Sequence, residues 1–528
     1  MNAHDTTPTA PSPAQGTGTN ETLLFWASFI ALIATAFGFI IRAQIIESEV
    51  WMREFNLSKT ELGNINGVGL WPFAISIVLF SLIIDKIGYG KAMIFAFVCH
   101  ISSAILTIKA TGYSSLYWAT FIAALGNGTV EAVINPVVAT LFSREKTKWL
   151  NRLHAGWPGG LVLGGILALS MGSVDWRYKV GLIFLPVVAY GILMIGRKFP
   201  VNERVAAGVS YKPMLQEVGI LGAAIVTILI VRVLGDTFHI PALIQVGVGA
   251  LMIAGYGAYV RSLGAPLFIA LLLIMIPLAT TELGTDSWIG DLMSPEMNKI
   301  GLAGGWVLIY TSLIMLILRF FAGPIVHKLS PLGLLAASAA VAALGLVFLS
   351  KAQGGMILAA ATLYGFGKTF FWPTMLGVVA EQFPKGGALT LNTIAGVGML
   401  AVGVVGSPLL GNIQDKETGR KLQSENPAIY EKVVGPEKTS VFGIYRPLEQ
   451  KKIDELPDDG QKVIKGIQNT AKKDALMMVA IFPCIMFASY IGLILYFQTR
   501  GGYKPKILIT QAEEDALMTG GAEGPAEM

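Results

Sequence analysis

Charged residues interrupt four long apolar stretches of the sequence. They are Arg42, Glu131, Glu282 with Asp286, and Lys368, each near the middle of its stretch. An ionisable side chain at the centre of a bilayer costs about 2.5–3.5 kcal/mol on insertion scales, so it should face a partner or a water-filled cavity. Such a set of residues could bind a polar solute, carry a proton or form structural ion pairs.

The elements that carry these charges are predicted to be membrane-spanning helices. Of the 528 residues, 53% are hydrophobic and 14% are charged, whereas soluble proteins have roughly 25% charged residues. A helix needs about 20 apolar residues to cross a hydrocarbon core of about 30 Å. Such stretches lie at about 23–46, 61–84, 92–110, 115–142, 155–173, 178–196, 218–235, 241–260, 265–290, 301–326, 332–350, 355–382, 388–411 and 475–498. The sequence therefore predicts an all-α membrane protein with 14 transmembrane helices.

Composition and motifs argue against several other classes of protein. The net charge of +5 comes from Lys and Arg in a few loops, so we expect no nucleic-acid binding. Cys99 and Cys484 lie in apolar stretches and predict neither a disulfide framework nor a metal site. The segment GFGKTFF is not a phosphate-binding loop, because position 362 is Thr where that loop needs Gly. We expect no cofactor, no metal and no enzyme activity.

The distribution of basic residues predicts how the chain is oriented. Short loops on one side of the bundle carry most of the Lys and Arg, among them Lys86 and Arg144. That side should be cytoplasmic, with both termini on it, in the cell (inner) membrane. Residues 1–21 and 499–528 are expected to form cytoplasmic tails, the first one disordered. Residues 412–474 would form an extracytoplasmic insert that acts as a lid, binds a partner or is mostly disordered.

An internal repeat predicts two halves. The segment FSREKTKWLN, which ends at Asn151, is similar to FPKGGALTLN, which ends at Asn392, an offset of 241 residues. A parallel repeat of this kind indicates two six-helix halves, at 22–197 and 264–498. The linker between them, residues 198–263, would contain two extra transmembrane helices.

The loop after the second predicted helix carries a family motif. In SLIIDKIGYGKAM, residues Asp85, Lys86, Gly88, Tyr89 and Lys91 match the signature loop of the major facilitator superfamily, and the chain resembles that family. The resemblance implies a fold of two six-helix halves, here with an inserted helix pair. It also implies that Asp85 and Lys91 take part in a conformational gate, and that the extra helices lie beside the twelve-helix core with a packing or lipid role.

Shorter motifs are similar to the fucose permease branch of sugar:proton symporters. These motifs are TELGTDSW, LRFFAGPIV, Leu150-Asn151, and Glu131 followed by Asn135-Pro136. That resemblance implies transport of a sugar or sugar derivative with a proton. The charge in the first helix is Arg42, however, and an arginine so placed resembles the organophosphate and organic-anion branches instead. Both substrate classes stay open at this point.

The resemblance also points the charged residues into a central cavity, because the first and fourth helices of each half line it in this family. On this hypothesis Glu131 carries the coupling proton and Arg42 or Lys368 holds an electronegative part of the solute. Alternatively, Glu131 forms a structural ion pair with one of those two cations. The predicted solute-binding set is Arg42, Glu282, Lys368, Trp372 and Asn135.

One further charge, Arg319, lies about eight residues from the end of its predicted helix. We expect its side chain to reach the cytoplasmic interface, where it would serve the gate as the second-half counterpart of the signature loop.

The sequence therefore predicts a secondary active transporter that works by alternating access. Its expected partners are a small polar solute, a proton and the lipid bilayer, and we expect a monomer. The alternatives are an organic-anion or organophosphate transporter that uses Arg42, and a membrane sensor built on a carrier scaffold that binds without transporting.

Overall fold

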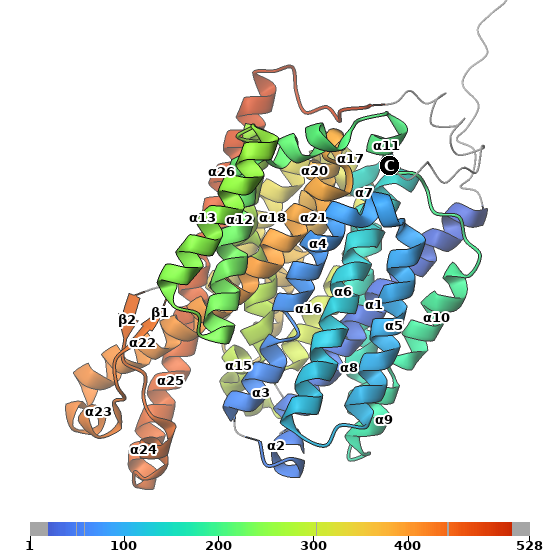
Figure 1. The fold of residues 1–528 in the computed structure, drawn as a ribbon. Helices are drawn as coiled ribbons and strands as arrows, with labels where there is room; N and C mark the ends of the chain where they lie inside the picture. Colours follow the sequence, from blue (N-terminus) through green and yellow to red (C-terminus); the bar gives the residue numbers. More distant parts are fainter. Residues whose placement is uncertain (1–18, 49, 58, 303, 441–442, 509–528) are drawn as a thin grey trace, which may run out of the picture.

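The structure, a computed structural model, describes residues 19–48, 50–57, 59–302, 304–440 and 443–508. Most of the two predicted tails, residues 1–18 and 509–528, lies outside the described residues. The described chain is a bundle of long helices with a smaller helical insert at one end (Figure 1).

The first half of the bundle is entirely helical where it is described. Its helices are α1 (Thr19–Glu47), α2 (Val50–Glu54), α3 (Lys59–Gly67), α4 (Trp71–Ile87), α5 (Tyr89–Ile108), α6 (Tyr113–Leu141), α7 (Lys146–His154), α8 (Gly156–Ser170), α9 (Trp176–Gly181) and α10 (Phe184–Met194). Long apolar stretches form helices here because a helix satisfies all of its own backbone hydrogen bonds in lipid.

The second half repeats this plan with more irregular helices. Its elements are α14 (Pro266–Ala279), the π-helix η1 (Thr280–Gly284), α15 (Thr285–Met297), the 3₁₀ turn η2 (Asn298–Ile300), α16 (Trp306–Phe320), α17 (Ala322–Leu329), α18 (Pro331–Lys351), α19 (Met356–Lys368), α20 (Phe371–Gln382), the 3₁₀ turn η3 (Pro384–Gly386), α21 (Gly387–Ala401), the π-helix η4 (Val402–Gly406), α22 (Ser407–Glu425) and α26 (Ile481–Gln498). π-Helical segments often mark functional sites. The π-helix η1 of the second half carries Glu282.

The predicted spans correspond to these helices. Twelve described helices are long and apolar enough to cross a membrane, and the bent pair α16–α17, with 69° between its helices, makes a thirteenth. The remaining predicted span, 355–382, is divided between α19 and α20, each too short to cross alone. The prediction of 14 helices and the structure thus agree once both broken spans are counted.

The linker forms α11 (Glu203–Ala206) and two long helices, α12 (Tyr211–Phe238) and α13 (Ala242–Val260). Helix α12 packs against α14 and α21 of the second half, whereas α13 packs mainly against α12 (Figure 1). Gly219 kinks α12 with a φ of 61°, and a Cβ there would lie 2.0 Å from the backbone nitrogen of Gly264. Only glycine accepts both this conformation and this close approach.

The insert between α22 and α26 is folded. It contains α23 (Pro427–Val433), the antiparallel strands β1 (Lys438–Ser440) and β2 (Gly443–Tyr445), α24 (Gln450–Asp454) and α25 (Asp458–Val479). Its own apolar core includes Leu422, Tyr430, Val433, Ile453 and Ile464. The described part of the insert is therefore not the mostly disordered loop that was one of the three expectations.

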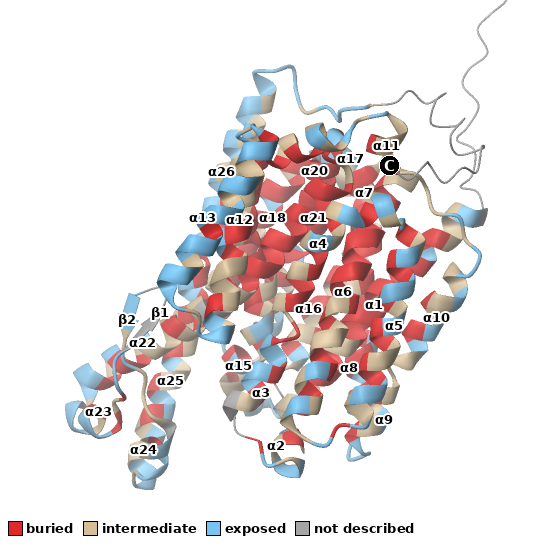
Figure 2. Cartoon of the chain, in the orientation of Figure 1, coloured by how far each residue is buried: buried red, intermediate tan, exposed pale blue. Residues whose placement is uncertain are grey.

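Burial follows the position of a residue in the bundle. Figure 2 shows buried residues along the centre of the bundle and exposed ones along α13 and the insert. Large apolar side chains on α13 are exposed, Leu243 by 84% and Leu251 by 74%, as expected of a surface that faces lipid. The two halves meet through α4 with α21, α7 with α20 and α8 with α16.

Candidate functional site

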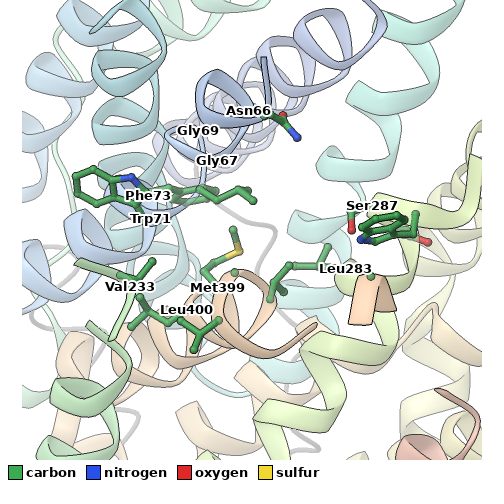
Figure 3. A pocket seen from close by; sticks show the side chains of 18 of the residues that line it. Asn66, Gly67, Gly69, Trp71, Phe73, Val233, Leu283, Ser287, Met399 and Leu400 are labelled. Carbon is green, nitrogen blue, oxygen red and sulfur yellow. The ribbon is translucent and has the colours of Figure 1, made fainter. Parts of the chain in front are cut away.

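A cavity of about 1010 Å³ lies between the two halves, toward the end of the bundle that carries the insert. We call this end the insert end. Figure 3 shows side chains from α3, α4, α12, α15 and α21 around the cavity. Its polar and aromatic lining includes Arg42, Asn66, Trp71, Asn127 and Trp157 from the first half and Asp286, Ser287 and Trp288 from the second.

Arg42 is the basic residue that the first half contributes to this lining. Its side chain is only 8% exposed, and its guanidinium carbon lies 5.9 Å from the centre of the Phe39 ring. A Cβ at Gly69 would lie 2.4 Å from Nη2, so the glycine leaves room for the guanidinium. Among the described residues no acidic side chain forms an ion pair with Arg42, and its Nε has no hydrogen-bond partner. A buried guanidinium of this kind is suited to bind an anionic group.

Asn127 adds a fixed amide to the same wall. Its Oδ1 lies 2.9 Å from Nε2 of His100, and Nδ1 of His100 lies 3.0 Å from the Tyr190 hydroxyl. All three side chains are buried. His100 thus holds a cavity residue in place.

Glu131 lies one helical turn from Asn127 in α6 and is not among the residues that line the cavity. Its carboxylate accepts a hydrogen bond of 2.7 Å from Nδ2 of Asn135, and Oδ1 of Asn135 lies 2.8 Å from Nε2 of His154. Glu131 is 5% exposed, and none of the described Lys or Arg side chains forms an ion pair with it. The alternative that Glu131 pairs with Arg42 or Lys368 is therefore not seen in this conformation.

Arg319 joins the two halves behind the cavity. It donates hydrogen bonds to the carboxylate of Glu282 (2.7 Å) and to the carbonyl oxygens of Thr369 (2.6 Å) and His154 (2.9 Å). Its side chain is 1% exposed, so the expected position at the cytoplasmic interface is wrong. A guanidinium with three acceptors, one of them a carboxylate, is satisfied in the interior and has no need to reach water.

Lys368 is also paired inside the second half. It forms an ion pair with Asp286, and its ammonium lies 5.1 Å from the centre of the Tyr364 ring. Asp286 lines the cavity, whereas Lys368 is fully buried behind it. The backbone nitrogen of Trp372 donates to Glu282 over 3.1 Å, and the indole is not among the cavity-lining groups.

The predicted solute-binding residues are thus distributed over two layers. Arg42 faces the cavity directly, while Glu282, Lys368, Trp372 and Asn135 lie in the layer behind it. The aromatic side chains in the cavity wall include Trp157 and Trp288, which the sequence analysis did not favour over Trp372. His154 was missed, because nothing in the local sequence shows that it touches Asn135.

Contacts between the halves close the opposite end of the bundle, which we call the closed end. Thr147 donates its backbone N–H (3.2 Å) and its hydroxyl (2.5 Å) to Glu381, and Lys146 bonds the carbonyl oxygen of Ala380 (3.2 Å). The repeat-related asparagines act alike: Asn151 donates to the Thr374 hydroxyl over 3.1 Å, and Asn392 donates to the Ala132 carbonyl over 2.9 Å.

The signature loop lies at the closed end and binds the linker. Asp85 forms an ion pair of 2.8 Å with Arg204, and the Tyr89 hydroxyl accepts from Nδ2 of Asn202 over 3.0 Å. Lys91 is exposed. Asp85 therefore contacts the segment that connects the two halves.

The segment after α26 crosses the closed end. The Tyr503 hydroxyl donates to Glu381 over 2.7 Å, the backbone nitrogen of Lys506 bonds the Glu381 carbonyl over 2.8 Å, and Gln382 donates to the Lys504 carbonyl over 2.9 Å. Burial, and then the charge of Glu381, raise the pKa of Tyr503 well above its usual value, so its hydroxyl keeps the donated proton. Glu381 thus binds both the first half and this segment.

Two halves around a cavity that is closed at one end define a membrane carrier fold. Within the described ranges, no three His, Cys, Asp or Glu side chains lie together as a metal site would require. The sequence model of the Major Facilitator Superfamily matches residues 24–408, and the chain belongs to this superfamily. No curated protein sequence is significantly similar to the chain.

Solved structures share the fold at low sequence identity. The Escherichia coli fucose:proton symporter FucP is 14% identical, with a TM-score of 0.55 over 90% of this chain and 99% of that one. The human organic anion transporter MFSD10 is 11% identical, with a TM-score of 0.59 over 89% and 99%. The proton:xylose symporter XylE is 12% identical, with a TM-score of 0.57 over 95% and 99%. At these identities the likeness concerns the fold alone.

Proposed function

We propose that this protein is a secondary active transporter that moves a small polar solute with an anionic group, such as a sugar acid, together with a proton. The observation that carries the proposal is Arg42, a buried cation in the cavity wall without an acidic partner among the described residues. A buried charge is costly unless it is paired. An anionic group of the solute would supply the missing partner.

The other buried charges support this assignment because they are already paired. Glu282 binds Arg319, and Asp286 binds Lys368, so the second half leaves no unpaired charge in this group. The sequence analysis proposed two cations for solute binding, Arg42 and Lys368. Because Lys368 is paired with Asp286, Arg42 is the one that remains for the solute. The solute would be held between Arg42 and the amides and indoles of the wall, including Asn127, Trp157 and Trp288.

The proposed proton site is Glu131. Its hydrogen-bond partner is the neutral amide of Asn135, and protonation would remove a buried charge that no cation of the described chain compensates. Through Asn135 and His154 the carboxylate is connected to Arg319, which binds the other half. A change at Glu131 can therefore reach the contact between the halves.

A second candidate is transport of a neutral sugar. Trp157, Trp288 and the amides of Asn66 and Asn127 line the cavity, and aromatic rings pack well against the apolar face of a sugar. On this alternative Arg42 would donate hydrogen bonds to sugar hydroxyl groups.

A thermal-shift screen of the purified protein distinguishes the two candidates. The panel contains sugars, sugar acids and sugar phosphates, each tested at two pH values. We expect anionic members to raise the melting temperature, and more so at the lower pH if binding takes up a proton. Loss of a charge-assisted hydrogen bond is worth about 1.5–3 kcal/mol, so Arg42→Gln should weaken anion binding about 10- to 100-fold.

The control is Arg53→Gln, which removes an exposed arginine whose guanidinium binds only a backbone carbonyl in the described chain. It should bind like the wild type. Stabilisation of the wild type by neutral sugars, with no response to anions, would support the neutral-sugar candidate and contradict the binding of an anionic group at Arg42.

A further inference from the structure

The inserted helix α12 reaches the cavity, although an inserted pair was expected to lie beside the core. Arg232, Val233, Asp236 and Thr237, in its last two turns, belong to the cavity lining. Figure 3 shows Val233 near Leu400, with the ribbon of α12 entering from the side of α21. The cavity wall is therefore built from three parts of the chain: the two halves and the linker.

The end of α12 is held against both halves. Its Phe238 ring makes an edge contact with Trp71 of α4, with 5.9 Å between the ring centres. Its other side packs along α21 and the adjoining η4 of the second half. Because Trp71 itself lines the cavity, the helix end is positioned by the wall that it completes.

Two charged side chains at this helix end form an ion pair in which another anion could replace the carboxylate. Nε of Arg232 lies 3.1 Å from Oδ2 of Asp236, four residues along the same helix, and the side chains are 40% and 55% exposed. Ion pairs between exposed residues at this spacing contribute little free energy because water competes for both partners. Arg232 can therefore leave Asp236 for a stronger acceptor at small cost.

The remaining charges around the cavity do not offer a comparable cation. Asp286 and Asp291 are paired with Lys368 and Lys472, whose ammonium groups face those carboxylates. The basic residues among the lining groups are Arg42, which is buried, and Arg232, which is water-accessible. A guanidinium binds carboxylate and phosphate groups through two parallel hydrogen bonds.

We propose that Arg232 is an outer binding station for the anionic group of the solute, from which the solute passes to Arg42. Asp236 competes with the solute for Arg232 and so sets its affinity. This inference rests on the proposed function, because it requires an anionic solute.

The test measures uptake of a labelled sugar acid into proteoliposomes by the wild type, Arg232→Gln and Asp236→Asn. Arg232→Gln should raise KM about three- to tenfold, because a water-accessible cation of the cavity wall is lost. Asp236→Asn should lower KM about two- to threefold, because the competing carboxylate is gone. A merely structural ion pair would be broken by either change, so both variants would then shift KM in the same direction.

The matched control is Lys212→Gln, at the start of the same helix, where the ammonium lies 5.9 Å from the Tyr259 ring and is not among the cavity-lining groups. Its KM should equal that of the wild type, and melting temperatures identify any variant that fails to fold. If the wild type takes up anions but both α12 variants shift KM in the same direction, or neither variant shifts it, the proposed role of Arg232 is wrong and the proposed function is not affected. If the wild type takes up no anion, the proposed function and the station are both wrong.

Discussion

Arg42 and Glu131 differ from Glu282, Asp286, Arg319 and Lys368 in lacking an oppositely charged partner within the described chain. Both belong to the first half, whereas Glu282 with Arg319 and Asp286 with Lys368 are compensated inside the second half. Binding an anion at Arg42 and a proton at Glu131 would remove both uncompensated charges. Electrostatics alone would then favour loading the two together, which is what symport requires.

Glu131→Gln tests the proton site. Glutamine keeps the shape and the hydrogen-bonding capacity toward Asn135 but cannot take up or release a proton. We expect proton-driven accumulation to fall to the level of passive equilibration, while exchange of internal for external solute continues at a rate within about threefold of the wild type. Uptake and counterflow in proteoliposomes measure the two activities separately.

Glu54→Gln is the control for this change, because Glu54 lies outside the cavity, bound to Arg177 and Trp176. It should accumulate solute normally. Undiminished accumulation by Glu131→Gln would exclude Glu131 as the proton site.

At the scale of residues, sequence analysis located the charges but not their partners. Arg42, Glu131, Glu282 and Lys368 are recognisable from the sequence, because a charged residue within a membrane-spanning stretch is energetically costly and therefore usually has a function. Their partners are far away in the chain: Arg319 contacts the backbone of His154, 165 positions earlier. No local spacing encodes such contacts, which is why Arg319 was expected at the interface.

At the scale of elements, helices α7 and α20 of the two halves approach each other closely at Gly377. A Cβ on Gly377 of α20 would lie 2.3 Å from Oγ1 and 2.7 Å from Cα of Thr147 in α7. Because the backbone of α7 is involved, no rotation of a side chain can relieve the overlap. Gly377 therefore allows α7 and α20 to come close enough together to close this end of the bundle.

Gly377→Ala should shift the protein toward the conformation in which this end is open. The labelling site is Thr374→Cys, in a background without Cys99 and Cys484, because Thr374 is fully buried against Asn151 of the other half. We expect maleimide to label this position at least about threefold faster when Gly377→Ala is present, since the added methyl group overlaps α7 only in the closed state.

Gly38→Ala is the matched control, since a Cβ at Gly38 in α1 meets nothing within 4 Å. It should leave the labelling rate unchanged and leave stability equal or slightly higher, because alanine favours a helix over glycine. Equal labelling rates for Gly377→Ala and the parent protein would show that this contact does not control closure.

Element positions were predictable where hydropathy alone decides them, and less so where helices break. The spans at 23–46 and 332–350 match α1 and α18 closely, because lipid imposes a minimum length on an apolar helix. The break between α19 and α20, next to Lys368, has no hydropathy signal. The place of α12 in the cavity wall also depends on packing that its apolar sequence does not specify.

At the scale of the whole molecule, the two ends of the bundle differ, because a cavity lies at one end and contacts between the halves close the other. The cavity lies toward the insert end, and contacts such as Thr147 with Glu381 close the other end.

The insert is attached to the second half beside the entrance of the cavity. Lys472 and Lys473 of α25 bind Asp291 and Glu296 of α15 over 2.8 and 2.7 Å. Tyr445 of the insert is among the cavity-lining residues. The 241-residue repeat predicted two halves, and the fold confirms a major facilitator architecture, but a repeat contains no information about segments that only one half has.

The most direct test of the account is uptake of a labelled sugar acid by wild-type protein in proteoliposomes with an inward proton gradient. The account predicts accumulation above the external concentration, loss of that accumulation when a protonophore is added, and loss of uptake in Arg42→Gln. Binding of the sugar acid without any uptake beyond that of protein-free liposomes would contradict it, and would indicate a sensor built on a carrier fold.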